Sequence, residues 1–224
     1  RLVKRFGLNP SPVTTQVEPH DSLAESYHII ARINSILIDF TQDMWLYISR
    51  TILVQKKIGG ETGSSTMPHK INPIYFENAE GNCGLANAIL NHLASKLTVS
   101  RMQRDLSGST VVRNQGVALG HSFVGLNNVM KGVDRITINQ ENMSVELDKH
   151  WEVLAEAIQT IMRKNGIPGA YNKMKNLTRG NYLDQVTIHK LISDLNITTD
   201  DKKILLKLTP TDYTGLANKL AQLK

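Results

Sequence analysis

Apolar residues recur at three- and four-residue steps through a long segment near the start of the chain. The segment covers residues 21–57 without a glycine or proline, and its apolar series is Leu23, Tyr27, Ile30, Ile33, Leu37, Phe40, Met44, Ile48 and Ile52. This spacing predicts an amphipathic helix with Asp21 as its N-cap. A helix of about 30 residues extends roughly 45 Å, which is typical of a rod in a large bundle.

Two further helices are predicted, and both carry small residues at interior positions. One runs from Asn72, as its cap, to about residue 96, with Pro73 at the first helical position. The other runs from Ser109 to Lys131 and ends at Gly132. A glycine inside a helix costs stability and usually marks the close approach of a neighbouring helix. The small residues are Ala79, Gly81, Gly84, Ala86, Ala88, Gly116, Gly120 and Gly125.

Beyond Gly132 the predicted helices are shorter. Residues 136–166 offer Asn139 as a cap and Gly166 as a stop, and helices follow at 170–177, 184–195, 199–208 and from 214. Alternating strand patterns are nearly absent, with residues 97–101 as an ambiguous exception. The sequence therefore predicts an all-α protein in two parts. Residues 1–133 belong to a bundle of long helices, and residues 134–224 form a smaller C-terminal helical domain.

Composition and charge narrow the class of protein. The 224 residues are 41% hydrophobic and 21% charged, as in a soluble globular protein. The formal charge is +6, but the Lys and Arg residues are scattered, which suits a protein that handles small polyanions better than one that binds nucleic acid.

The single cysteine and the lack of long apolar runs bear on location. Cys83 has no partner for an intrachain disulfide, which fits a reducing compartment. No apolar run approaches the roughly 20 residues that span a bilayer, and no charged-then-apolar leader opens the chain. A cytoplasmic protein without membrane association is expected. The absence of an initiator methionine indicates a fragment.

Residues 59–73, between the first two predicted helices, read GGETGSSTMPHKINP. Their glycines suit a loop that opens and closes. Ser64 and Ser65 supply hydroxyl and N–H groups, and Lys70 supplies a positive charge. The helix that follows adds free N–H groups and the positive end of its dipole. We interpret the segment as an anion-binding loop that also holds a nucleophile or base. A plain Gly/Ser linker is the alternative, and the G-x-x-x-x-G-K spacing of a Walker A loop is missing.

The segment GSSTMPHKINPIYFE resembles the signature G-S-S-x-x-P-x-K-x-N-x-x-x-x-E of the fumarase/aspartase superfamily, whose members cleave C–N or C–O bonds and release fumarate. Within that superfamily, TTQVEPHD and RDLSGSTVVRN are similar to the adenylosuccinate lyase family, particularly its bacterial members. The resemblance extends through HWEVLAEAIQTIMRK and LTPTDYTG, over essentially the whole chain. It implies that this chain is the C-terminal half or so of the enzyme. The N-terminal part, with the histidine that acts as the acid, would then be missing.

The resemblance implies a β-elimination. Its substrates would be adenylosuccinate, which gives AMP, and the succinylaminoimidazole carboxamide ribotide of purine nucleotide biosynthesis. A base removes the proton next to one succinyl carboxylate, and an acid protonates the departing nitrogen. Preorganised donors must hold the doubly charged aci-carboxylate that forms between these steps. Neither a cofactor nor a metal is implied.

The catalytic roles implied by motif position fall on Ser64 and Glu77. Ser64 matches the base, and its hydroxyl ionises only if the loop closes, expels water and surrounds the oxygen with N–H donors and Lys70. Ser65 then matches an oxyanion donor. Because the two serines are adjacent, only the resemblance ranks Ser64 first. Glu77 matches the carboxylate that orients the acid histidine and holds its tautomer.

Other matched positions bind the substrate. Lys70 and Asn72 match residues that hold the succinyl carboxylates, although Asn72 also suits a simple cap. Met67 contacts the substrate or staples the loop. Arg and Ser side chains at a helix start can bind phosphate, and the positions that match nucleotide- and substrate-binding residues are Gln16, Arg104, Ser109 and Arg113.

The resemblance also implies a homotetramer in which three subunits build each active site. Alternatives remain within the superfamily, namely argininosuccinate lyase, fumarase and aspartase, although MPHKINP with RDLSGSTVVRN favours the purine enzyme. A non-catalytic helical scaffold of the same shape is a further alternative, which the intact Ser64, Lys70, Asn72 and Glu77 oppose. A basic nucleic-acid binder would show duplex affinity that falls steeply with salt.

Overall fold

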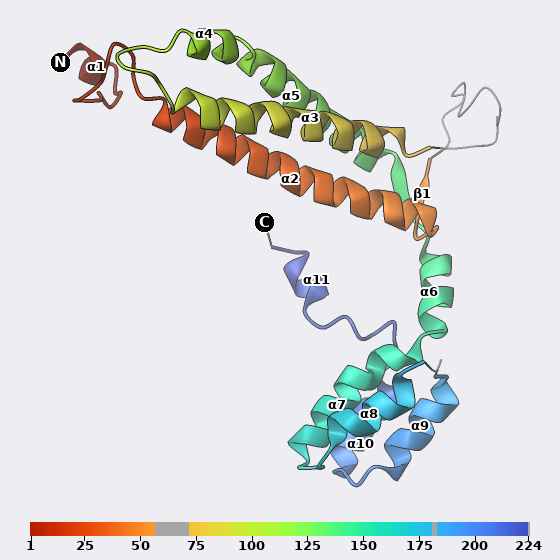
Figure 1. Ribbon diagram of the computed structural model, residues 1–224. Helices are drawn as coiled ribbons and strands as arrows, with labels where there is room; N and C mark the ends of the chain where they lie inside the picture. The colour runs from red at the N-terminus through yellow and green to blue at the C-terminus, as the bar shows by residue number, and fades with distance from the viewer. Residues whose placement is uncertain (57–71, 181–182, 224) are drawn as a thin grey trace. The chain divides into compact units, whose positions relative to one another are not determined.

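The computed structural model describes residues 1–56, 72–180 and 183–223. The chain divides into two compact units, Arg1–Ile138 and Asn139–Lys224, and the division lies a few residues beyond the expected boundary at 133. Helices make up nearly all the regular structure of the described residues (Figure 1), so the all-α prediction is confirmed. Within those residues, every helix is too short or too polar to span a bilayer.

Three helices lie side by side in the first unit: α2 (Asp21–Ser49), α3 (Ile74–Leu97) and α5 (Gln115–Asp134) (Figure 1). Two short helices, α1 (Leu2–Arg5) and α4 (Ser107–Val112), also belong to the described part of this unit. The long first helix is therefore present with about the predicted length, but it ends at Ser49, before Ile52, the last residue of the predicted apolar series. In the N-terminal half of α2, two alanines and Tyr27 pack into a core shared with α3. The buried residues of this core are Ala24, Tyr27, Ala31, Ala86, Leu90, Leu93, Ala94, Leu97 and Ala118.

The predicted caps of α2 and α3 are wrong by one residue. The N-cap of α2 is His20, with φ of 63°, and its N–H donates to the Glu18 carboxylate at 2.8 Å. Asp21 is instead the first helical residue, where its negative charge interacts favourably with the positive end of the helix dipole. The N-cap of α3 is Pro73 rather than Asn72. The turn that precedes each helix determines where the helix begins, and the type of a single residue does not predict it.

The predicted third helix is in fact two helices. The break falls at Arg113 and Asn114, between α4 and α5. Asn114 has φ −90° and ψ 0°, and its side-chain Nδ2 donates to the Thr110 carbonyl at 3.2 Å. The same kind of bond from Asn82 and Asn128 lies inside the unbroken helices α3 and α5, so this bond alone does not account for the break. The break was missed because it changes no apolar spacing.

A buried polar group joins the three long helices. Asn34 of α2 is 2% exposed, and its Nδ2 donates to Asn87 Oδ1 of α3 at 3.0 Å and to Ser122 Oγ of α5 at 2.8 Å. A buried amide costs free energy unless it is bonded. This network therefore favours one register of the three helices over others.

Among the described residues of this one chain, the close-packing prediction for the glycines is met at Gly125. A Cβ there would lie 2.5 Å from Cys83 Sγ, and Gly132, expected only as a helix stop, would place one 2.8 Å from the Phe76 ring. Gly81, Gly84, Gly116 and Gly120 have nothing within 4 Å of the same position among the described residues. Those glycines face away from the described neighbouring helices. Apolar periodicity alone does not tell which glycines of a helix face a neighbouring helix and which face away.

A two-stranded antiparallel sheet was not predicted. Strand β1 (Leu53–Gln55) pairs with β2 (Ile136–Ile138), in the register Leu53 with Ile138 and Gln55 with Ile136. Residues 97–101, the ambiguous candidate, instead end α3 and form a turn. Three-residue strands are too short to show a period of two.

The second unit is a cluster of short helices (Figure 1). Its elements are α6 (Gln140–Asp148), the 3-10 helix η1 (Trp151–Leu154), α7 (Ala155–Lys164), α8 (Ala170–Thr178), α9 (Gln185–Asp194), α10 (Thr199–Lys207) and α11 (Ala217–Leu220). Asn139 caps α6 as predicted, accepting the Asn142 N–H at 3.2 Å. Gly166 follows α7 with φ of 67°. The buried core is Trp151, Leu154, Ile158, Met162, Ala170, Met174, Leu183, Ile188, Ile192 and Leu205.

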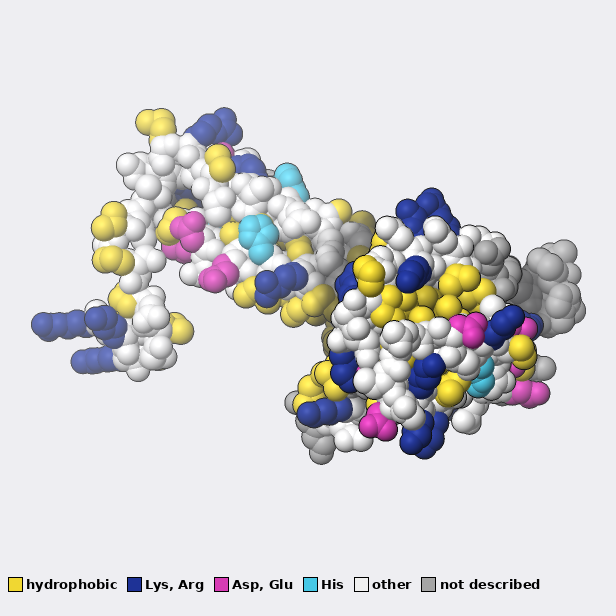
Figure 2. Space-filling view, turned by 90° about the horizontal axis from the view of Figure 1, so that it is seen from below, with side chains coloured by type: hydrophobic (Ala, Val, Ile, Leu, Met, Phe, Trp, Pro, Cys, Tyr) yellow, Lys and Arg dark blue, Asp and Glu magenta, His cyan; other side chains and the backbone are white. Residues whose placement is uncertain are grey.

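Charged side chains are spread over the surface. On the face seen in Figure 2, Lys and Arg side chains are dispersed among acidic and apolar ones and do not gather into one continuous stripe. This distribution agrees with the scattered basic residues of the sequence.

Asp201 is a buried carboxylate that joins α7 to α10. It is 2% exposed and accepts from Lys164 Nζ at 2.7 Å and from Asn165 Nδ2 at 2.8 Å. Its own N–H donates to the hydroxyl of Thr198, the N-cap of α10, at 3.3 Å. The hydrogen bonds from Lys164 and Asn165 lower the pKa of Asp201 to about 2.

We expect Asp201→Asn to destabilise the second unit in a pH-dependent way. Because the folded pKa lies below the value of about 4 in an unfolded chain, the carboxylate stabilises the fold fully above about pH 4 and loses this effect as the pH falls towards 2. The difference in melting temperature between the parent and Asp201→Asn should therefore shrink as the pH falls from about 5 to 2. A difference that stays constant over this range would contradict the assignment. Thermal unfolding followed by circular dichroism measures it.

Candidate active site

The structure describes some of the expected site residues and leaves the others out. Ser64, Ser65, Met67 and Lys70 lie outside the described residues. The remaining candidates form two groups. Asn72 and Glu77 lie at the start of α3, and the other group, near its end, is Gln16, Arg104, Ser109 and Arg113.

Glu77 lies in the first turn of α3 and faces α2. Its Oε1 accepts a hydrogen bond from Trp45 Nε1 at 3.1 Å, and Trp45 is the sole side-chain donor to Glu77 among the described residues. One turn further along, Glu80 accepts from Gln42 Nε2 at 3.0 Å. These four side chains line an open cavity of about 280 Å³. Trp45 therefore holds one oxygen of Glu77 and leaves the other for a further partner, such as an imidazole.

Trp45 was not predicted as a site residue. A lone indole on a long amphipathic helix usually indicates packing, although Trp45 is 45% exposed. Only its position across from Glu77, on an antiparallel helix, reveals its hydrogen bond. No signal in the sequence pairs these two residues.

The second group lies around the connection between α3 and α4. The Gln16 N–H donates to the Gln103 carbonyl at 3.2 Å, which places Gln16 beside Arg104 in the chain that follows α3. Ser109 lies in α4, and its hydroxyl donates to the Leu106 carbonyl at 2.8 Å. The Ser109 oxygen thus keeps its lone pairs for a donor. Gln16, Arg104 and Arg113 are exposed.

Asp105 organises the charges at this end of the unit. Its carboxylate accepts from Lys96 Nζ at 3.4 Å and from Arg101 Nε at 3.2 Å. Hydrogen bonds from the Ser107 hydroxyl, from Arg101 and from the Ser107 N–H hold the pKa of Asp105 well below its usual range. Arg104 and Arg113, by contrast, form no ion pair with any described residue. They are available to an external anion.

The two groups lie at opposite ends of α3. Glu77 and Leu97 are twenty positions apart on one continuous helix, which corresponds to about 30 Å. A small substrate does not span that length. One copy of the described residues therefore does not bring Glu77 and Arg104 into the same site.

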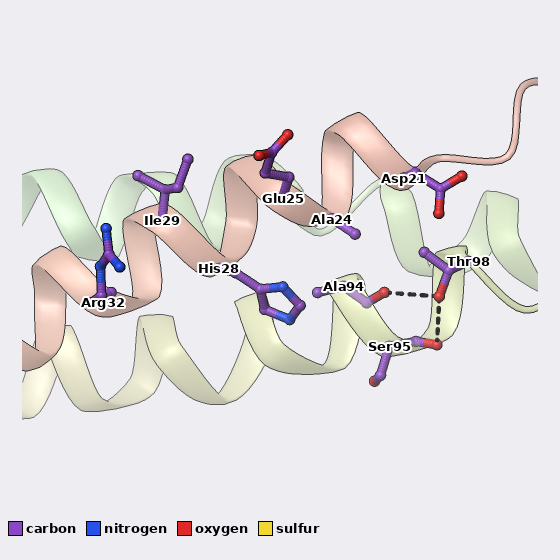
Figure 3. A pocket seen from close by; sticks show the side chains of 9 residues that line it. All are labelled: Asp21, Ala24, Glu25, His28, Ile29, Arg32, Ala94, Ser95 and Thr98. Atoms are coloured by element: carbon purple, nitrogen blue, oxygen red, sulfur yellow. Dashed lines mark hydrogen bonds between the residues drawn. The ribbon is translucent and has the colours of Figure 1, made fainter. Parts of the chain in front are cut away.

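A larger cavity lies elsewhere in the first unit. It measures about 600 Å³ and opens between α2 and α3, lined by Asp21, Ala24, Glu25, His28, Ile29, Arg32, Ala94, Ser95 and Thr98. Figure 3 shows the His28 ring extending from α2 towards α3, with Glu25 and Arg32 on either side of it along α2. No residue implied by the resemblance lines it. The candidate chemistry therefore lies outside this cavity.

Comparison with protein families gives two matches. Residues 100–214 match the model described as adenylosuccinate lyase C-terminal, and residues 2–87 match the model described as lyase. Adenylosuccinate lyase of Legionella pneumophila strain Corby is 54% identical over 221 residues, which cover 99% of this chain and 48% of that protein. The enzyme of Escherichia coli K12 is 51% identical over 216 residues, or 96% of this chain and 47% of that protein. The chain thus spans about half the length of these relatives.

Solved structures show the same fold. The 3-carboxy-cis,cis-muconate lactonizing enzyme from Pseudomonas putida superposes with a TM-score of 0.71 at 20% identity, over 97% of this chain and 50% of that one. A structure titled fumarate lyase:delta crystallin from Brucella melitensis gives a TM-score of 0.62 over 92% of this chain and 44% of that one, also at 20% identity. At this identity the likeness concerns the arrangement of helices. The matched family model covers more than half of the residues, and with the close relatives it shows that the chain belongs to the adenylosuccinate lyase family.

Proposed function

We propose that this chain is part of an enzyme that releases fumarate from adenylosuccinate and from the succinylaminoimidazole carboxamide ribotide, by β-elimination. The observation that carries the proposal is the pair of exposed arginines, Arg104 and Arg113, which lack an ion-pair partner among the described residues. Both substrates carry a phosphate, which needs such charge-assisted donors. Argininosuccinate, malate and aspartate carry no phosphate, so this feature favours the purine substrates within the superfamily.

The proposed chemistry uses groups that precede α3 in the sequence or lie in its first turn. Ser64 removes the proton next to the succinyl carboxylate, while Lys70, Asn72 and Ser65 stabilise the charge that develops. Met67 lies against the substrate. The Trp45 hydrogen bond supports a fixed carboxylate at Glu77, because the second oxygen can then hold an imidazole in one tautomer. That histidine belongs, in this proposal, to a part of the enzyme outside this chain, and it protonates the departing nitrogen.

The proposed active site is shared among subunits of a homotetramer. The separation of about 30 Å between Glu77 and the Arg104 group supports sharing, because α3 is one unbroken helix. Large apolar side chains on the long helices are also exposed and suit contact with further helices; they include Ile29, Ile33, Ile36, Leu85, Val117, Phe123, Val124, Leu126 and Met130. A monomeric mass by light scattering of the full-length enzyme would contradict the tetramer.

An assay of fumarate release tests the proposed function. We expect the full-length enzyme to release fumarate from adenylosuccinate, and not from argininosuccinate, malate or aspartate, when each is supplied at the same concentration. Fumarate is measured by its absorbance or by a coupled enzyme. Release from argininosuccinate alone would assign a different member of the superfamily. Release from none of the four would favour a non-catalytic scaffold.

The proposal also covers the cellular compartment of the protein and its lack of affinity for nucleic acid. A reducing, cytoplasmic compartment suits Cys83, which is free and buried in the core. The dispersed Lys and Arg side chains in Figure 2 favour a small anionic substrate over a nucleic acid. A duplex affinity that falls steeply with salt would contradict this.

A further inference from the structure

Asp105 is the centre of the connection between α3 and α4. Its side chain is 9% exposed, and both of its oxygens are occupied. Oδ2 accepts from Lys96 at the end of α3, and Oδ1 accepts the Ser107 N–H at 3.0 Å and the Ser107 hydroxyl at 2.7 Å at the start of α4. Arg101 donates to both oxygens, at 3.2 and 3.3 Å. One carboxylate therefore ties the end of one helix to the start of the next.

The segment that Asp105 ties down carries the residues expected to bind phosphate. Arg104 precedes it directly, and Ser109 and Arg113 follow on and just after α4. Met102 adopts φ of 51°, a left-handed conformation that is costly for a residue with a side chain. Three residues later, the chain is fixed by the Asp105 N–H, which donates to Ser100 Oγ at 3.1 Å. Asp105 thus stabilises a backbone that would not adopt this path by local preference.

Asp105 also determines which of the nearby cations are paired. Four cations lie close together in the sequence here, and they are Lys96, Arg101, Arg104 and Arg113. Asp105 pairs with the first two. Arg104, although it is the neighbour of Asp105 in the chain, forms no ion pair with a described residue. The carboxylate therefore pairs with Lys96 and with Arg101, whose side chain is 81% exposed, and leaves Arg104 and Arg113 without an ion pair among the described residues.

We propose that Asp105 is a positioning residue for the phosphate of the substrate: it fixes the α3–α4 connection so that Arg104, Ser109 and Arg113 present their donors to that phosphate. The inference rests on the proposed function, because it concerns the same substrate. It assigns Asp105 no contact with the substrate. Its effect should appear only where a phosphate is bound.

The test compares a substrate with and without phosphate. Asp105→Asn keeps the shape and can still accept from Ser107, but its amide N–H₂ faces the donors of Lys96 and Arg101. In the full-length enzyme, we expect the KM for adenylosuccinate to rise about tenfold or more, since misplacement of binding groups has effects of this size or larger. The KM for the dephosphorylated succinyl nucleoside should stay unchanged, and kcat should change by less than about threefold. Equal changes for both substrates, or no change, would overturn the proposal.

Two further variants separate positioning from general stability. Ser107→Ala removes one donor to Asp105 without changing charge, and it should shift the KM for adenylosuccinate in the same direction by a smaller factor. Asp184→Asn is the matched control, because Asp184 accepts the Thr187 N–H at 2.8 Å and caps α9 in the other unit. It should lower the melting temperature and leave both KM values unchanged. A rise in KM with Asp184→Asn equal to that with Asp105→Asn would count against the proposal.

A binding measurement separates this inference from the proposed function. Isothermal titration with AMP and with adenosine needs no turnover. If the parent enzyme released no fumarate from adenylosuccinate, the proposed function would fail, whatever Asp105 does. If the parent bound AMP more tightly than adenosine and Asp105→Asn kept that preference, the inference alone would fail. Loss of the preference in the variant is the expected result.

Discussion

Replacing Ser64 by alanine in the full-length enzyme should lower kcat about a thousandfold or more and leave the KM for adenylosuccinate within a few-fold of the parent value. General base catalysis contributes about 10²–10⁴ to a rate, and alanine has no group that can take the proton. The hydroxyl acts on the reacting carbon and contributes little to holding the phosphate or the succinyl carboxylates. Initial rates of fumarate release over a range of substrate concentrations separate the two constants.

Ser65→Ala is the matched comparison, because Ser65 is the next residue and has the same side chain. As an oxyanion donor its hydroxyl would contribute less than the base, and its backbone N–H survives the substitution. We therefore expect a smaller loss of kcat with Ser65→Ala than with Ser64→Ala. The reverse order would transfer the role of the base to Ser65. Undiminished turnover in Ser64→Ala would mean that another residue removes the proton.

Gly132→Ala should lower the free energy of unfolding by about 1–2 kcal/mol. The added Cβ would lie 2.8 Å from two atoms of the Phe76 ring, and Phe76 is 1% exposed. The ring packs edge-to-face against Phe40 at a centroid distance of 6.3 Å, so it has little room to move. Overpacking of this kind costs about 1–3 kcal/mol, and the gain of about 1 kcal/mol from helix propensity offsets part of it. Chemical denaturation of the purified protein measures the difference.

Two variants check that the cause is the Phe76 contact. Gly120→Ala adds the same methyl to the same helix, but nothing in the described chain lies within 4 Å of it. Its stability should be unchanged or higher by up to about 1 kcal/mol. Phe76→Leu should reduce the cost of Gly132→Ala when the two are combined, because a smaller side chain leaves space for the methyl. Strict additivity of the two changes would contradict the proposed clash.

Prediction from the sequence was most accurate where a pattern repeats over many turns. The α2 helix and the short helices α8, α9 and α10 lie within a few residues of their expected ends. It failed at single-residue features. The break between α4 and α5 falls at Arg113 and Asn114 without a change in apolar spacing, and the strands β1 and β2 exist only because two distant segments of three residues pair. Neither feature leaves a period in the sequence.

The candidate site shows a similar division. The signature around Ser64, Lys70 and Asn72 is a short ordered motif, so the sequence predicts its chemistry; because Ser64 and Lys70 lie outside the described residues, this stays a prediction. The hydrogen-bond partners of the site residues could not be predicted from the sequence. Trp45 and Glu77 are distant in the sequence and meet only because α2 and α3 run antiparallel. The role of Asp105 depends on where Lys96 and Ser107 point, which the i, i+4 spacing of Arg101 and Asp105 only partly indicates.

Local chemistry, then, was legible in the amino-acid order: apolar spacing specifies helices, and a run of glycine, serine and lysine before a helix start indicates an anion site. The distances between functional groups could not be predicted from the amino-acid order. That Glu77 and Arg104 lie at opposite ends of α3, and that Arg104 is left unpaired while Arg101 is not, follow from how the helices pack and how the chain turns after Leu97. Such contacts join residues that no local preference relates, so they are settled only when the whole unit buries its core.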